Sequence, residues 1–286
     1  MRSTVSLSLL VLTSTLGAQV PTDIFLAPLS MQGGRPVVGP AVNITNAPGY
    51  DNQPSFTPDS RAILFTSNRQ GGQTDIYRYD VATKTTTRIT STPESEYSPT
   101  VMPGGNRFSV IRVEKDSTQR LWSFAMDGTD PQVILPALKP VGYHAWLDAD
   151  HLALFVLGSP NALVYGNVRS GKCDTLARGI GRSLSRLPTS PGFSFTQLVD
   201  SAARVRTLSG PGGTPRDVVS LPKGSQDLAW MTDGTLLTGG GTKILSWQSG
   251  AIAWATAGEL TGLRDVTRLA VSPDGKWLAI VAMTAP

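Results

Sequence analysis

The chain has 286 residues, of which 40% are hydrophobic and 16% are charged, and its formal net charge is +4. This composition is that of an ordinary globular protein and excludes a chain without a packed core. The charge is modest for the length and no run of five or more Lys and Arg occurs, so nucleic-acid binding is not supported. The 29 Gly and 21 Pro favour an all-β chain with many turns.

The first segment, residues 1–18, has the pattern of a secretory signal peptide. One Arg precedes an apolar stretch from Val5 to Leu16, and small residues follow it. This stretch is too short to span a bilayer as a helix, which takes roughly 20 residues. We therefore expect cleavage after Gly17 or Ala18, export to the periplasm or beyond, and no transmembrane segment. No Cys follows the leader, so we expect no lipid anchor there; an uncleaved anchor is the alternative.

A repeat of about forty residues follows the leader. Its clearest unit, residues 50–92, contains four short strand-like runs: QPSF, AILFTSNR, DIYRYD and TTTRIT. Apolar, aromatic and β-branched residues fill the runs, while Pro, Asp, Gly and Asn mark the gaps between them. Four short strands in a unit of this length are typical of one blade of a β-propeller.

The turn after the first run of each unit shows how often the repeat recurs. The turn residues are spaced by 45, 45, 40, 44 and 41 positions. They are Pro58, Pro103, Asp148, Pro188, Thr232 and Pro273. The sixth unit ends after two strands, and residues 22–46 carry the pattern of the two strands that it lacks. The N-terminal strands are therefore expected to complete the C-terminal blade.

These observations predict an all-β fold, a six-bladed β-propeller of four-stranded antiparallel blades whose ring is closed by the N-terminal strands. We expect one domain over residues 19–286. Its blades are expected at residues 50–92, 97–138, 141–180, 181–224, 226–263, and 265–286 together with 22–46. A β-sandwich is the alternative, but it calls for neither six evenly spaced turns nor split ends.

One unit carries a recognisable motif. Residues 57–80 read TPDSRAILFTSNRQGGQTDIYRYD, and SPDGKWLAIV from Ser272 repeats the first half. This stretch resembles the TolB-type propeller repeat. The matching positions are Ser67, Arg69, Gly71, Ile76, Tyr77 and Asp80. The resemblance implies the propeller fold, but it says little about function because one fold hosts unrelated activities. TolB carries an α/β domain before its propeller, and the segment between the leader and Asp23 is too short for one, so we expect a TolB-like propeller without it.

Catalytic and metal-binding motifs are not recognisable in the sequence. The Walker-like string GNVRSGKC at residues 166–173 has Cys where a phosphate loop needs Ser or Thr. His144 and His151 are the two histidines, and no G-x-S-x-G motif accompanies them. One Cys and two His are too few for a zinc site of known spacing. We therefore expect no catalytic residue, no metal and no cofactor.

The candidate site lies on the propeller axis. The first strand of each blade lines the central channel, and the segments that lead into these strands converge at one mouth. The predicted ligand-binding residues at this mouth are Asp51, Gln53, Glu96, Tyr97, Tyr143, His144, Arg182, Gln226, Asp227, Asp265 and Arg268. Carboxylates, aromatic rings and arginines together suit a polar ligand, a cation or a peptide chain end. A solvated rim around a water-filled channel is the alternative.

Two functions fit this pattern. The first is an exported, monomeric, non-catalytic binding or scaffold protein that holds a protein or peptide through one propeller face. The alternative is an enzyme of the lactonase or glycan-processing kind. It would hold a divalent ion such as calcium in the channel, with Asp51, Glu96, Asp227 and Asp265 as oxygen ligands.

Overall fold

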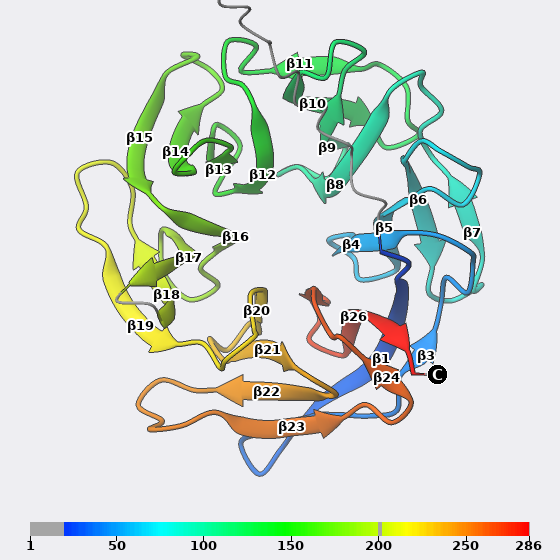
Figure 1. The fold of residues 1–286 in the computed structure, drawn as a ribbon, viewed down its shortest axis with the longest axis vertical. Coiled ribbons are helices and arrows are strands. Elements are labelled where there is room, and N and C mark those ends of the chain that lie inside the picture. The colour runs from blue at the N-terminus through cyan, green and yellow to red at the C-terminus, as the bar shows by residue number, and fades with distance from the viewer. Residues whose placement is uncertain (1–19, 200–201, 286) are drawn as a thin grey trace, which may run out of the picture.

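The computed structural model describes residues 20–199 and 202–285. The regular secondary structure in this part of the chain consists of β-strands. Six small antiparallel sheets surround a common axis, as Figure 1 shows. The predicted all-β, six-bladed propeller is therefore confirmed. The expected signal peptide lies outside the described residues. Within those residues, no helix is long and apolar enough to cross a membrane.

Five blades each consist of four consecutive strands. Blade 1 contains β4 (Asp51–Phe56), β5 (Ala62–Ser67), β6 (Asp75–Asp80) and β7 (Thr86–Arg88). Blade 2 contains β8 (Ser95–Val101), β9 (Arg107–Val113), β10 (Gln119–Ala125) and β11 (Gln132–Ile134). Blade 3 contains β12 (Val141–Trp146), β13 (His151–Val156), β14 (Ala162–Asn167) and β15 (Cys173–Arg178). Blade 4 contains β16 (Ile180–Arg186), β17 (Phe193–Val199), β18 (Ala202–Leu208) and β19 (Arg216–Ser220). Blade 5 contains β20 (Leu228–Trp230), β21 (Leu236–Gly240), β22 (Lys243–Trp247) and β23 (Ala255–Glu259).

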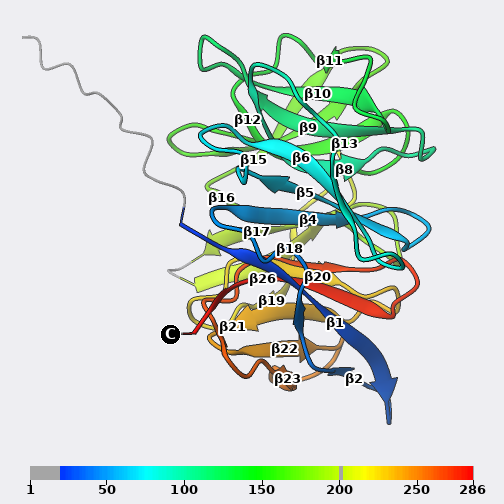
Figure 2. The same cartoon turned by 90° about the vertical axis from the view of Figure 1, so that its right-hand side faces the viewer.

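Blade 6 joins the two ends of the chain. Its C-terminal part contains β24 (Leu263–Arg264), β25 (Leu269–Val271) and β26 (Trp277–Thr284), and its N-terminal part contains β1 (Asp23–Gln32), β2 (Arg35–Val38) and β3 (Val42–Asn43). β26 pairs antiparallel with β1, in a register that runs from Asp23 opposite Ala282 to Pro28 opposite Trp277. β2 and β3 both pair with β1. Figures 1 and 2 show β1 and β26 side by side, so the predicted ring closure is confirmed.

The hydrophobic core lies between neighbouring blades. Every residue of β5 is buried, because both faces of blade 1 are covered by its neighbours. Leu64 and Ile76 of blade 1 pack with Phe108 and Phe124 of blade 2 in one cluster. Middle strands that are covered on both faces need apolar side chains at successive positions, which explains why AILF reads as a continuous run rather than an alternating pattern.

The TolB-type motif residues have structural contacts. In the turn of blade 1, the Asp59 carboxylate accepts hydrogen bonds from the Thr57 hydroxyl at 2.6 Å and the Arg61 amide at 3.1 Å. The Arg69 guanidinium pairs with Asp51 at 3.0 Å and lies over the Tyr77 ring, 4.9 Å from its centroid. The motif therefore fixes a turn and the packing of a blade, which is why it identifies the fold.

The pairing of β1 with β26 is expected to contribute strongly to the stability of the fold. Ile24 of β1 is fully buried, in a cluster that spans blades 6 and 1. We expect Ile24→Ala to lower the free energy of unfolding by about 2–5 kcal/mol, because it removes buried methyl groups and leaves a cavity. Ser30→Ala, at an exposed position of the same strand, should change it by less than about 0.5 kcal/mol. Urea unfolding measures both, and equal effects of the two substitutions would contradict a stabilising role for the closure.

Candidate functional site

The first strands of the six blades line a cavity of about 680 Å³ on the axis. The repeat spacing of the turns also relates the residues that line it, so the lining includes four rings of equivalent residues, one of which is Pro54, Pro99, His144, Leu184, Leu228 and Leu269. The rings are named by their order along the first strands, from the inner ring at the start of these strands to the outer ring next to the turns. The inner ring is Gln53, Ser98, Tyr143, Ser183, Asp227 and Arg268. The middle ring is Ser55, Thr100, Ala145, Ser185, Ala229 and Ala270. The outer ring is Phe56, Val101, Trp146, Arg186, Trp230 and Val271.

One carboxylate at the inner ring faces two guanidiniums. Arg182 donates two hydrogen bonds to Asp227, from Nε to Oδ1 at 3.1 Å and from Nη2 to Oδ2 at 2.5 Å. Arg268 Nη1 lies 3.7 Å from the same Oδ1 atom. Asp227 is only 6% exposed, so the two guanidiniums stabilise a carboxylate that has lost most of its water. The fork-like geometry of the first contact fixes the orientation of Arg182.

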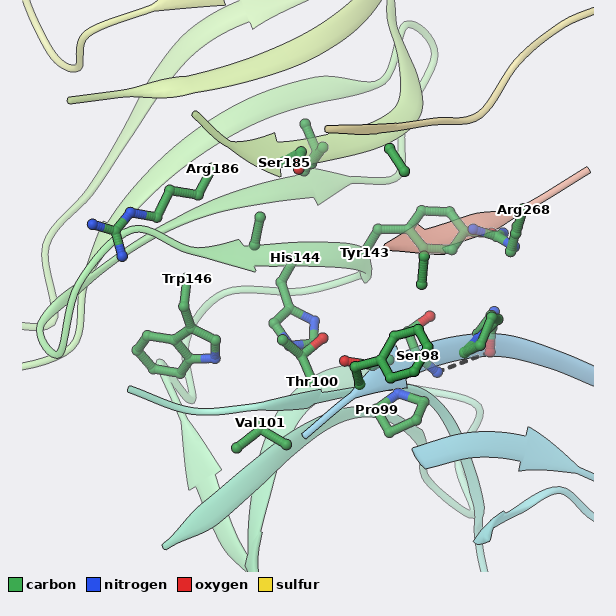
Figure 3. Close-up of a pocket in the computed structure, with 18 of the residues that line it drawn as sticks. Ser98, Pro99, Thr100, Val101, Tyr143, His144, Trp146, Ser185, Arg186 and Arg268 are labelled. Atoms are coloured by element: carbon green, nitrogen blue, oxygen red, sulfur yellow. Dashed lines mark hydrogen bonds between the residues drawn. The ribbon is translucent and has the colours of Figure 1, made fainter. Parts of the chain in front are cut away.

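A second contact of Arg268 crosses the axis. Arg268 directly precedes β25 of blade 6, and Tyr143 belongs to β12 of blade 3, which is the opposite blade in a ring of six. The guanidinium donates a hydrogen bond to the Tyr143 hydroxyl at 2.9 Å, and its Cζ lies 4.8 Å from the ring centroid. Figure 3 shows the two side chains next to each other. The inner ring is therefore bridged from one side of the channel to the other.

Tyr50 belongs to the same group of charged and aromatic side chains, although it is absent from the predicted site. Burial raises the pKa of Tyr50 to about 12, against the lowering effect of Arg268, and Tyr143 and Tyr97 contribute to the rise. Tyr50 directly precedes Asp51, at the start of the first strand of blade 1. In the sequence, only its position at the start of this strand could have identified Tyr50 as a residue near the channel.

Six of the eleven predicted site residues line the cavity. They are Gln53, Tyr143, His144, Arg182, Asp227 and Arg268. The other five lie elsewhere in the structure. They are Asp51, Glu96, Tyr97, Gln226 and Asp265. Their ligand-binding role stays a prediction, but the structure brings only the first group together around the axis.

The five residues outside the cavity have partners or neighbours of their own. Asp51 is buried in blade 1 with Arg69, and Asp265 is exposed and pairs with Arg264 at 2.6 Å. Tyr97 packs against the core between blades 2 and 3. Gln226 lines a separate cavity of about 190 Å³. Successive side chains of a strand point in opposite directions, so the segments that converge at the mouth turn only some of their side chains to the axis.

Glu96 is held inside blade 2. It is fully buried, it accepts hydrogen bonds from the hydroxyls of Thr90 at 3.0 Å and Thr92, and its Oε1 lies 3.4 Å from Arg112 Nε. Burial raises the pKa of Glu96 to about 7, and this effect outweighs the lowering by Thr92, Thr90 and Arg112. Glu96 therefore titrates near neutral pH without touching the channel.

The four carboxylates of the predicted cation site do not converge. Each has an arginine partner: Arg69 for Asp51, Arg112 for Glu96, Arg182 for Asp227 and Arg264 for Asp265. In the described part of the chain, no group of three or more His, Cys, Asp and Glu side chains is arranged to hold a metal ion. The residues present do not fit a divalent-ion site of the kind that the sequence suggested.

His144 lines the cavity but is hydrogen-bonded into the interface of blades 2 and 3. Its Nε2 atom lies 2.6 Å from the Ser109 hydroxyl, which also accepts a hydrogen bond from Trp146 Nε1 at 2.9 Å. Burial lowers the pKa of His144 to about 3, so the ring is neutral at neutral pH. Its Nδ1 atom is buried and meets no hydrogen-bond partner among the described residues. The same holds for Oγ of Ser98 in the inner ring.

The comparisons with known proteins agree with the fold. No family model matches the chain. A segment of 29 residues, 10% of the chain, is 62% identical to the Tol-Pal system protein TolB of Bordetella pertussis, and it covers 7% of the length of that protein. The resemblance to the TolB-type repeat is therefore confirmed in sequence over this segment.

Solved structures extend the likeness to almost the whole chain. A putative TolB from Agrobacterium tumefaciens matches with a TM-score of 0.74 and 13% identity, over 93% of this chain and 100% of that one. A gluconolactonase from Xanthomonas campestris matches with a TM-score of 0.66 and 8% identity, over 93% and 98%. An oligogalacturonate lyase in complex with manganese matches with a TM-score of 0.57 and 14% identity, over 86% and 80%. At these identities the likeness shows a shared propeller fold, which hosts both TolB and enzymes.

The raised pKa of Glu96 predicts a pH dependence of stability. Because about 7 lies above the ordinary value of 4.5, the folded protein binds more protons than the unfolded chain between these pH values. The free energy of unfolding should therefore fall as pH rises through this window. Glu96→Gln removes the titrating carboxyl group. The difference in free energy of unfolding between wild type and variant should therefore change by on the order of 2–3 kcal/mol between pH 4 and pH 8.

Denaturant unfolding at several pH values measures this difference. Glu259→Gln, at an exposed position paired with Lys243, is the matched control and should leave the pH profile unchanged. Parallel profiles for wild type and Glu96→Gln would show that Glu96 keeps an ordinary pKa in the fold.

Proposed function

We propose that this protein is an exported, monomeric, non-catalytic binding module that holds a protein or peptide partner through one propeller face. The observation that carries the proposal is the axial cavity of about 680 Å³, which the first strands of all six blades line in four rings. Concave sites with a few fixed polar groups are the usual binding sites of folded proteins. The cavity reaches the surface at the turns after the first strands, where the exposed residues Pro58, Pro103 and Pro273 line it.

The chemistry of the cavity supports binding rather than catalysis. Asp227 is held between two guanidiniums, so its oxygens are already engaged by Arg182 and Arg268. Ser109 and His144 are within hydrogen-bond distance, as a nucleophile and its base would be. However, Ser109 is fully buried and does not line the cavity, and no carboxylate orients His144 through Nδ1 among the described residues. This pair is better explained as a link between blades 2 and 3.

Export rests on the leader, residues 1–18, and on the TolB-like repeat. The mass of the mature protein checks this part of the proposal. Loss of the first 17 or 18 residues in the envelope fraction supports it, and a full-length chain in the cytoplasm would contradict it.

A channel-blocking variant tests the binding face. Ser185 of the middle ring lines the cavity, so Ser185→Trp should fill part of it without removing an ion pair. We expect wild-type protein to retain a specific partner from an envelope extract and Ser185→Trp to retain less than about one tenth of it, a loss of at least 1.4 kcal/mol. Ser170→Trp, in an exposed turn of blade 3, should retain the partner like wild type.

The measurement is quantitative mass spectrometry of the retained proteins, with a thermal melt of each variant to confirm folding. If folded Ser185→Trp retains as much partner as wild type, the partner binds outside the channel.

A lyase or lactonase with a divalent ion in the channel is the second candidate function. The observation that favours it is the fold likeness to an oligogalacturonate lyase in complex with manganese and to a gluconolactonase. The carboxylates of this chain argue for the binding protein instead, since a metal ion would have to displace guanidiniums from several of them.

Metal analysis separates the two candidates. For the binding protein we expect less than about 0.1 calcium, manganese or zinc ion per chain. A chelator should then shift the melting temperature by less than about 1 °C, because no ion stabilises the folded state. One tightly held divalent ion per chain, with a clear loss of stability on chelation, would favour the enzyme.

A further inference from the structure

The cavity is positively charged. Four charged side chains line it: the guanidiniums of Arg182, Arg186 and Arg268, and the carboxylate of Asp227. His144 is neutral at neutral pH because burial lowers its pKa to about 3. Three positive groups against one negative group give the lining a net charge of +2. Low-dielectric walls of one sign concentrate the field and favour an anionic ligand.

Arg186 is the guanidinium without a partner in this set. Arg182 and Arg268 share Asp227, whereas the Arg186 side chain is exposed and makes no hydrogen bond or ion pair with any described residue. It occupies the outer-ring position that holds Phe56, Val101, Trp146, Trp230 and Val271 in the other blades. Figure 3 shows Arg186 at the far side of the site from Arg268. The outer ring is thus an apolar rim with a single unneutralised cation.

We propose that the cavity binds the C-terminal end of an acidic peptide, which enters from the turn face with its chain extended. The α-carboxylate would lie at Arg182 and Arg268, and an acidic side chain about three residues earlier would lie at Arg186. This inference rests on the proposed binding function and names its ligand. Capture of a chain end by its carboxylate is a recognised mode of peptide binding.

The spacing of the two cationic positions fits an extended chain. Arg182 and Arg186 belong to the same strand, β16, and are four residues apart. At about 3.3 Å per residue they are separated by at most roughly 13 Å along the strand, because the register of β16 shifts between Ile180 and Leu184. A bound peptide in extended conformation covers this distance with about four residues. A single small acid is too short to reach both positions.

Two residues of the cavity lining carry an unpaired polar atom. Nδ1 of His144 and Oγ of Ser98 are buried and have no hydrogen-bond partner among the described residues. Buried polar groups are nearly always paired in folded proteins, so these two call for a partner. Neither atom reaches the cavity surface, so a bound peptide meets them only if the lining shifts. The partly exposed Val101, Trp230 and Val271 of the outer ring offer apolar contact to its side chains.

A pair of peptide libraries tests the proposal. One library is randomised at six positions and ends in a free carboxylate, and the other has the same composition but ends in an amide. We expect wild-type protein to retain the free-acid library at least tenfold more than the amide library, with Asp and Glu enriched three residues before the end. Hydrogen bonds to a charged group are stronger than those between neutral groups, which is consistent with a difference of tenfold or more.

Two arginine variants locate the contact. Arg186→Gln should lower retention of the free-acid library about fivefold and abolish the enrichment of Asp and Glu, while its thermal melt stays that of wild type because the side chain is exposed. Arg169→Gln, at an exposed position that pairs with Asp150, is the matched control and should behave like wild type.

Equal retention of the acid and amide libraries, or an unchanged Arg186→Gln variant, overturns the proposal. Preferential binding of galacturonate oligomers to the cavity would also overturn it, in favour of a sugar acid. If the libraries fail while wild-type protein still retains an envelope partner that Ser185→Trp loses, the binding function stands and only the chain-end inference is rejected. If both experiments fail, the binding function is rejected as well.

Discussion

The pairing of β1 with β26 is the constraint on which the rest of the structure depends. Six consecutive residue pairs, from Asp23 with Ala282 to Pro28 with Trp277, join the ends of the chain in one sheet. Without them blade 6 would lack β1, β2 and β3, and blades 1 and 5 would each lose a packing surface. The cavity depends on the same pairing, because β26 holds β25, and β25 begins directly after Arg268. The contact of Arg268 with Tyr143 on the opposite blade exists only in a closed ring.

Polar side chains also connect neighbouring blades. Trp146 of blade 3 donates to Ser109 of blade 2, and Trp230 of blade 5 donates to Ser194 of blade 4 at 2.8 Å. The two tryptophans occupy equivalent positions of the repeat. Each anchors the end of a first strand to the second strand of the preceding blade. A histidine beside such a serine is therefore part of a structural contact, and its presence near the axis does not indicate an acid–base catalyst.

The sequence was sufficient for the fold because turns and strand runs recur at a fixed spacing, and because the two ends complement each other. It was not sufficient for the site, because spacing places a residue on a strand but does not set the direction of its side chain. Asp51 and Glu96 lie in the segments expected at the mouth, yet they point into the blades and pair with Arg69 and Arg112. β-bulges follow Asn52 and Tyr97 in the same two strands, and a bulge shifts the alternation of side chains in a way that composition does not reveal.

Arg186 is a candidate site residue that the repeat pattern of the sequence could have predicted. Five of the six outer-ring positions carry apolar residues, and the sixth carries an arginine. An exception in a periodic set is visible in the sequence once the blades are aligned, and it points to a residue whose role is not packing. Tyr50 offered a weaker signal, since it precedes the repeat position rather than occupying it.

The split of blade 6 between the two termini has a consequence for biosynthesis. A chain made from its N-terminus exposes β1 before any other strand, and the partner of β1 is among the last segments to appear. Contacts between residues so far apart in sequence form slowly, because a long loop must close first. Until then the apolar edge of Ile24 and Phe25 is open to other chains. The edge of the first strand that pairs with β26 therefore stays unpaired until the last strand has been made.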